Sequence, residues 1–230
     1  MRTSLALAIL FTLPSAAGAF EPTSAYEKRE VSGFSILVHS DVLKHETEAK
    51  DAFTELESQL KKLCEAVPEK PLTELKKVRI WVEWEAKKNG AAEFHPSAGW
   101  LKDHGYNPDK AQAVEINNAR NFVKWSRRSQ PWMLMHELAH AYHFRVLGDK
   151  YPPLHDAFKQ AKERKLYDEV DRVGAKKKEK AYAMTEPAEY FAELTEAYFG
   201  KNDFFPFNRA ELEKHDPVGF ALMRKAWDGK

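Results

Sequence analysis

His136-Glu137-Leu138-Ala139-His140 is a five-residue stretch flanked by the apolar runs 131–135 and 141–144. Residues four apart lie on the same face of a helix, so the two imidazoles can bind a single metal ion. Glu137 lies about 100° round the helix, where its carboxylate reaches a water molecule bound to that ion. The stretch therefore predicts a largely buried helix over about 131–147 with a metal-binding face.

The two histidines and the glutamate match the H-E-x-x-H pattern, which is typical of zinc hydrolases. A catalytic zinc ion needs a third protein ligand and one open position for water. His143 lies on the same helical face as His136. However, seven residues along a straight helix is about 10 Å, which is too far for a shared ion. The third ligand must therefore come from another element of the chain.

The first 19 residues are predicted to be a signal peptide. Met1-Arg2 gives a basic start, an apolar segment follows at 5–13, and Ala17-Gly18-Ala19 fits a cleavage site. The remaining residues, 20–230, have a length typical of one domain, and we interpret them as a single domain. The signal peptide predicts a secreted or periplasmic protein, and no later segment is apolar enough to act as a membrane anchor.

The composition excludes several classes of function. A formal net charge of +1, with acidic and basic residues interspersed, gives no basic surface for nucleic acid. The single cysteine, Cys64, rules out an internal disulfide bond, and its position in an amphipathic segment indicates a buried side chain and not a catalytic thiol. We expect a monomer that selects its partner at a cleft.

Hydrophobic periodicity predicts an α+β fold. Alternating apolar residues indicate strands at Phe34–His39, Val78–Trp84 and Ala113–Asn117, and three- and four-residue spacings indicate a helix over 46–67. Further helices are expected over 153–166 and 186–198, and two short ones begin after Asn208 and Asp216. The chain should form a small N-terminal mixed sheet with a covering helix, followed by a mostly helical C-terminal half.

Three segments carry residues whose roles the sequence leaves open. The loop over 90–110 contains His95 and His104, which are either exposed loop histidines or part of a second metal site. The strand Ala113–Asn117 is either an ordinary edge strand or an edge that pairs with an extended substrate. The basic segment Lys176–Lys180 is either a solvated loop or a binding surface.

A stripe of glutamates follows one face of the last long predicted helix. Its members lie within about 80° of one another: Glu186, Glu189, Glu193 and Glu196. Such a stripe is commonly a solvated face. Opposite two helical histidines, it can instead supply a metal ligand and, one turn later, a carboxylate that accepts the other ring N–H of a ligating histidine. Glu189 with Glu193 meets both needs, whereas Tyr190 stands one turn after Glu186.

The segment Tyr182-Ala-Met-Thr-Glu-Pro-Ala-Glu189-Tyr-Phe-Ala-Glu193 resembles the corresponding segment of zinc metallopeptidases of the anthrax lethal factor type, a family that includes the bacterial Pro-Pro endopeptidases. These proteins are gluzincins with a zincin-like catalytic domain. The resemblance implies that His136, His140 and Glu189 bind one Zn²⁺ ion, that Glu137 is the base and that Tyr182 assists catalysis. Residues 20–110 show no such match, so the family's substrate preferences are not carried over.

The sequence therefore predicts a secreted or periplasmic zinc-dependent endopeptidase that acts on a peptide or protein substrate. Glu137 would take a proton from a zinc-bound water as the water attacks, and deliver it to the leaving amine. The Tyr182 hydroxyl would stabilise the developing oxyanion, its alternative being an ordinary packed aromatic residue. Two alternatives remain for the whole protein: a zinc-binding pseudo-enzyme or recognition module, and a metal-free protein in which the motif is coincidental.

Overall fold

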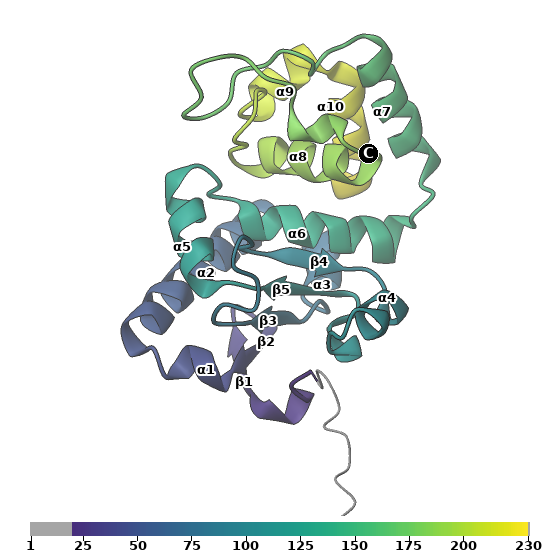
Figure 1. Ribbon diagram of the computed structural model, residues 1–230. Coiled ribbons are helices and arrows are strands. Elements are labelled where there is room, and N and C mark those ends of the chain that lie inside the picture. The colour runs from purple at the N-terminus through teal and green to yellow at the C-terminus, as the bar shows by residue number, and fades with distance from the viewer. Residues whose placement is uncertain (1–19, 230) are drawn as a thin grey trace, which may run out of the picture.

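The computed structural model describes residues 20–229, so the predicted signal peptide over 1–19 lies outside the described residues. A five-stranded sheet forms the base of the fold (Figure 1). Its strands are β1 (Tyr26–Val31), β2 (Phe34–His39), β3 (Ile80–Val82), β4 (Glu93–His95) and β5 (Ala113–Ile116). Across the sheet they follow the order β1-β2-β3-β5-β4. The β1 and β4 strands are antiparallel to their neighbours, and β2, β3 and β5 run parallel.

The sheet begins with a hairpin whose turn explains its register. Ser32 and Gly33 both have positive φ angles, 53° and 83°, as a two-residue hairpin loop requires. Val31 is thereby paired with Phe34 and Tyr26 with His39. Phe34 is fully buried, as its apolar alternation predicts.

The described part of the chain forms ten α-helices in addition to the sheet. They are α1 (Ser40–Leu43), α2 (Glu46–Ala66), α3 (Glu69–Leu75), α4 (Ala98–Asp103), α5 (Ala119–Arg128), α6 (Met133–Tyr142), α7 (Pro152–Glu163), α8 (Pro187–Phe199), α9 (Arg209–His215) and α10 (Pro217–Met223). Single π-helical turns extend α6 over His143–Leu147 and α10 over Arg224–Asp228. A 3₁₀ turn at Tyr182–Met184 precedes α8.

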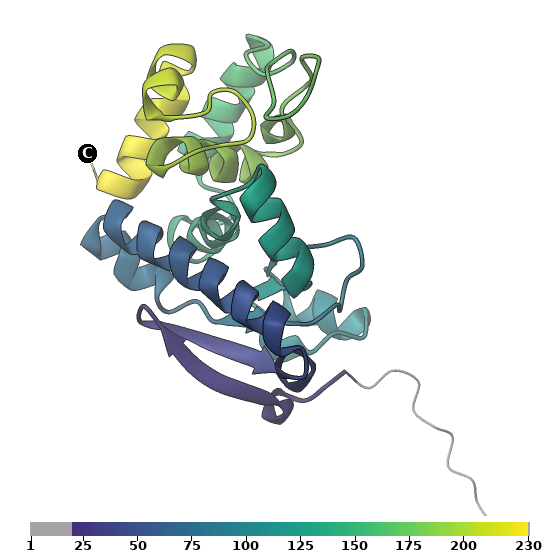
Figure 2. The same ribbon diagram turned by 90° about the vertical axis from the view of Figure 1, so that its left-hand side faces the viewer.

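One long helix covers the sheet, as the sequence predicts. The α2 helix lies across the β1–β2 hairpin (Figure 2). Its residues Leu56, Leu60 and Leu63 are almost completely buried. The α6 helix crosses the molecule between the sheet and the C-terminal helices (Figure 1). Its residues Leu134 and Leu138 are fully buried in the same core. A helix with apolar residues on most of its surface is stable only when it is covered on several sides, which is the position of α6.

The C-terminal helices pack around α8. Asp216 is 1% exposed, and its side chain accepts hydrogen bonds from the hydroxyls of Tyr167 and Tyr190. The same carboxylate accepts a bond from the Gly219 N–H at 2.9 Å and so caps α10. One buried acidic group therefore joins α8, α10 and the segment that follows α7.

The predicted α+β class is confirmed, with a small mixed sheet, a covering helix and a mostly helical C-terminal half. The strand at 113–117 is predicted to lie at the edge of the sheet, and this prediction is wrong. The corresponding strand β5 lies inside the sheet, between β3 and β4, and β4 is the edge strand. Glu115 gives β5 its alternating pattern, yet this residue is also buried, held by Lys110 and His95. No helix of the described residues is both long and apolar enough to cross a bilayer.

Candidate metal and active site

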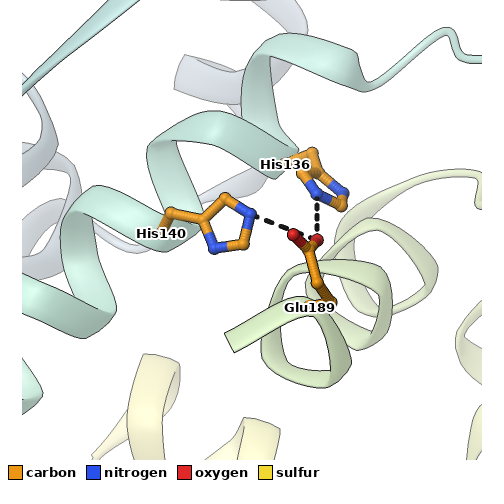
Figure 3. Close-up of side chains that lie close together, drawn as sticks. All are labelled: His136, His140 and Glu189. Carbon is orange, nitrogen blue, oxygen red and sulfur yellow. Dashed lines mark hydrogen bonds and ion pairs between the residues drawn. The ribbon is translucent and has the colours of Figure 1, made fainter. Parts of the chain in front are cut away.

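The helix α6 holds its histidines on the face that meets α8. A residue of the covering helix α2 holds the first turn of α6 in place: the Gln59 side chain accepts a hydrogen bond from the Leu134 N–H at 3.0 Å. Buried polar groups of this kind satisfy backbone donors that a helix start leaves unpaired. Since Leu134 and Leu138 face the core, His136 and His140 lie toward α8 (Figure 3).

The second helix of the site, α8, approaches α6 closely. Gly200 ends α8 next to Trp132, and a Cβ atom built on Gly200 would lie 1.9 Å from Cε2 of that indole. Only a glycine therefore allows the two helices this separation. The approach brings the glutamates of α8 against the histidines of α6.

Three side chains converge where the two helices face each other. His136 Nε2 lies 3.0 Å and His140 Nε2 lies 3.3 Å from the same oxygen, Glu189 Oε2 (Figure 3). One ligand atom from each of the three residues lies within 4.8 Å of the other two. Ligands at about 2.0 to 2.2 Å in a tetrahedral arrangement are separated by about 3.4 Å, so two imidazoles and one carboxylate at these distances fit a zinc ion.

Burial and charge determine the protonation of these groups. Burial lowers the pKa of His136, but hydrogen bonds to Glu189 and Glu196 outweigh burial and hold that pKa well above its usual value. Burial likewise raises the pKa of Glu189, and its hydrogen bonds with His136 and His140 reverse the shift and lower it strongly. A metal ion at this point would displace the proton of His136, because only a neutral imidazole binds a metal.

The carboxylate that contacts the other nitrogen of His136 is Glu196. Its Oε1 lies 2.8 Å from His136 Nδ1. The sequence predicts Glu193 for this contact, but Glu193 instead accepts a hydrogen bond from the side-chain amide of Asn202 at 3.0 Å. A residue one turn past Glu189 points too far round α8, whereas Glu196, two turns past it, faces Nδ1. Burial raises the pKa of both carboxyls, and each stands beside the other.

Glu137 is oriented by the edge strand of the sheet. The backbone N–H of Phe94, in β4, donates a hydrogen bond of 2.9 Å to Glu137 Oε2. The carboxylate therefore lies between the face of α6 that carries the two histidines and the edge strand β4. No sequence pattern predicts this contact, because β4 has only three residues and falls in a region with several turn signals.

Tyr182 stands on the open side of the cluster. Its hydroxyl donates to Glu189 Oε1 at 3.1 Å, and the side chain is 47% exposed. Burial, followed by the charge of Glu189, raises the pKa of Tyr182, so its hydroxyl is a hydrogen-bond donor at neutral pH. The predicted residues His136, Glu137, His140, Tyr182 and Glu189 are thus brought together in space.

These groups line a cleft of about 420 Å³ between the edge strand and α8. Its lining residues are Ala91, Ala92, Glu93, Phe94, Trp125, Gln130, Met133, His136, Glu137, His140, Tyr182, Glu189, Glu193 and Glu196. The cleft is open to solvent beside Tyr182 and is large enough for a few residues of an extended chain.

A second group of candidate ligands lies under the sheet. Glu93, His95 and Glu115 come close enough to hold an ion. However, the ammonium of Lys110 is bonded to Glu115, and His95 Nε2 lies 2.6 Å from the other oxygen of the same carboxylate. The positive charge that the carboxylate requires is therefore already present, and this group is an internal ion-pair network. His104 stacks on Trp100 at the surface.

Comparisons with known proteins give limited similarity. No family model matches the chain, and no curated protein matches it. The solved structure of the Pro-Pro endopeptidase PPEP-2 from Paenibacillus alvei is similar to it with a TM-score of 0.47 and 22% sequence identity. The similarity covers 76% of this chain and 90% of that chain.

Proposed function

We propose that this protein is a zinc-dependent endopeptidase that holds one Zn²⁺ ion with His136, His140 and Glu189. The convergence of both Nε2 atoms on Glu189 Oε2 carries the proposal, because two imidazoles and one carboxylate leave the fourth position of a zinc ion open. Such a ligand set is typical of catalytic zinc sites, whereas structural zinc sites use four protein ligands. The position of the three residues at the wall of a cleft supports a catalytic role.

A zinc ion held there would supply Lewis-acid chemistry, which polarises a peptide carbonyl and makes water nucleophilic near neutral pH. Glu137 is the group that accepts a proton from the attacking water and returns it to the leaving amine. Its bond from the Phe94 N–H fixes one carboxylate oxygen and leaves the other free for this transfer. No protein nucleophile is required.

Tyr182 is proposed to stabilise negative charge on the carbonyl oxygen of the substrate. Its hydroxyl already reaches the proposed ligand Glu189, and its exposed side chain can turn toward a bound peptide. A hydrogen bond that forms with the developing oxyanion lowers the barrier and leaves substrate affinity almost unchanged.

An extended peptide is the substrate that the cleft fits best. The outer edge of β4 pairs with no strand among the described residues, and β4 forms one wall of the cleft. A peptide that lies along this edge could donate a backbone hydrogen bond to the Phe94 carbonyl, since the Phe94 N–H is bonded to Glu137, and would place one of its peptide bonds beside that carboxylate. The substrate edge predicted for the strand at 113–117 is thus assigned to β4.

The remaining parts of the proposal concern the whole chain. Residues 1–19 are proposed to direct export and to be removed, which gives a secreted or periplasmic enzyme. Residues 20–230 are proposed to act as a single zincin-like catalytic domain and as a monomer.

The test is cleavage of a proteome-derived peptide library with and without a chelator, with the new termini identified by mass spectrometry. Wild type should cleave the library only without chelator. The Glu137→Gln variant should keep its zinc and lose cleavage, whereas Glu163→Gln, an exposed change on α7, should retain it. Full activity in Glu137→Gln would contradict the mechanism. Full zinc content without any cleavage by wild type would favour the zinc-binding recognition module.

A further inference from the structure

A second cavity lies beside the cleft, on the other side of Trp125 and Gln130. This second cavity also has a volume of about 420 Å³, and Trp125 and Gln130 line both. It lies between the C-terminal end of α5 and the loop that connects α7 to α8. A peptide that passes the proposed zinc ligands in this direction would extend into it.

Two arginines give the second cavity its charge. Arg128, at the end of α5, and Arg172, in the α7–α8 loop, line it together with one acidic residue, Glu179. Arg172 is held in place by Asp203 at 3.3 Å and Glu179 at 3.4 Å, and its guanidinium lies over Phe204. Arg128 is exposed and forms no ion pair with any residue of the described chain. Arg128 therefore carries the uncompensated charge of the cavity.

The loop beside the cavity adds more positive charge. Lys176, Lys177, Lys178 and Lys180 are all exposed. The loop lies on the same side of the molecule as the end of α5 in both views (Figures 1 and 2). The cleft that holds the proposed zinc ligands has no arginine or lysine in its lining. The basic groups are therefore gathered at the second cavity and its loop.

We infer that the second cavity is a substrate subsite that binds an acidic side chain, Asp or Glu, of the peptide through Arg128. The inference rests on the proposed peptidase function and names a specificity that the function leaves open. A carboxylate in the cavity would form a charge-assisted hydrogen bond with a guanidinium that has no competing carboxylate. A glutamine of the same size would lack that charge.

The test uses a peptide that wild type cleaves, with a single Glu or Gln placed in turn at each position on both sides of the cleaved bond. At one position, the peptide with Glu should be cleaved with a kcat/KM about fivefold higher than the peptide with Gln at low salt, mainly because its KM is lower. Added salt should reduce the ratio, because the pair is partly exposed to solvent. In Arg128→Gln the ratio should fall to about one, and Arg128→Glu should instead favour Lys at that position.

Arg127→Gln is the matched control, because it removes the same charge from the neighbouring residue of α5. Arg127 pairs with Asp51 and Glu55 of α2 and does not line the cavity. The ratio of kcat/KM for the Glu and Gln peptides should therefore be the same in Arg127→Gln as in wild type. Cleavage with the same kcat/KM for Glu and Gln at every position would contradict the subsite while leaving the peptidase proposal intact. An equal fall of the Glu-to-Gln ratio in Arg127→Gln and Arg128→Gln would also contradict the subsite. Absence of chelator-sensitive cleavage would contradict the peptidase proposal and this inference with it.

Discussion

His136 Nδ1 lies 2.8 Å from Glu196 Oε1, so both nitrogens of this imidazole are in contact with carboxylates of α8. The contact has a clear consequence for the tautomer. If Nδ1 carries the proton and donates it to Glu196, the lone pair of Nε2 is free for a metal ion. Glu196 is therefore a positioning residue for the proposed ligand His136, and its contribution can be measured separately from that of the ligands.

We expect Glu196→Ala to weaken zinc affinity by about 10- to 100-fold, because His136 loses the group that fixes its ring. The affinity is measured by competition with a chromophoric chelator. Glu193→Gln is the control, since Glu193 bonds to Asn202 and not to His136, and its zinc affinity should change much less. A larger loss in Glu193→Gln than in Glu196→Ala would show that the two roles are reversed.

Tyr182→Phe should lower kcat by about 100-fold, which corresponds to the loss of one oxyanion donor of about 3 kcal/mol. The zinc content and the unfolding temperature should stay at wild-type values, because the hydroxyl is on a half-exposed side chain. Steady-state kinetics on a cleaved peptide give the result, with Tyr106→Phe, another exposed tyrosine, as control. An unchanged kcat would assign Tyr182 to packing alone.

Gly200→Ala should destabilise the protein by about 1 to 3 kcal/mol, because the new methyl group would overlap Trp132 and push α8 away from α6. Zinc affinity should fall as well, since the same helices carry the proposed ligands. Urea unfolding measures the first effect. In the control Gly99→Ala, the nearest atom to the new Cβ is Ser97 Oγ at 3.7 Å, so stability should be unchanged or slightly higher. Equal stability of both variants would contradict the close approach.

Acid should weaken the fold through Glu115. Burial raises the pKa of this carboxyl, but the hydrogen bond with His95 and the charge of Lys110 outweigh burial and lower the pKa below its ordinary value of 4.5. A lowered pKa contributes stability above pH 4.5, and that contribution disappears as the pH falls through the folded-state pKa. Glu115→Gln should therefore be less stable than wild type at pH 7 by about 3 kcal/mol.

The difference between the two proteins should shrink below pH 4.5, where wild type loses the contribution of its carboxylate. Urea unfolding from neutral to acidic pH measures both curves. A difference in unfolding free energy that stays constant over this range would mean that Glu115 is not ionised in the folded protein.

Much of the fold could be predicted because apolar periodicity follows directly from burial. The strand Phe34–His39 and the helix at 46–67 agree closely with β2 and α2. Asn208 and Asp216 cap short helices as predicted, since an Asn or Asp side chain satisfies the first backbone N–H groups. The β1 strand could not be predicted in this way, because its residues are mostly charged and partly exposed and β2 determines its pairing.

The helix starts show where local signals fail. Ser129 is a residue type that caps helices, but α6 begins at Met133, and Ser129 instead ends α5, an amphipathic helix capped by Asn118 that the predicted elements do not include. Thr185 precedes α8 and is a residue type that caps helices, but its hydroxyl donates to the Tyr182 carbonyl. Tertiary contacts, such as that of Gln59 with the start of α6, replaced these caps.

The candidate site was predictable where it depends on spacing along one helix. Four-residue spacing places His136 and His140 on one face, and the stripe on α8 contains the carboxylate that meets them. The choice between Glu193 and Glu196 depends on the rotation of α8 about its axis, which the spacing of the glutamates does not determine. The contact of Phe94 with Glu137 depends on a three-residue strand whose pairing is nonlocal.

The zinc site itself is tested most directly by titrating metal-free protein with Zn²⁺ and recording the zinc X-ray absorption spectrum of the loaded protein. We expect one zinc ion per chain, bound by two imidazole nitrogens and by oxygen ligands at about 2.0 to 2.2 Å. In Glu189→Gln the affinity should fall, while Glu186→Gln, at the start of the same helix, should bind zinc as wild type does. Failure of wild type to bind zinc, or a spectrum without imidazole ligands, would contradict the account.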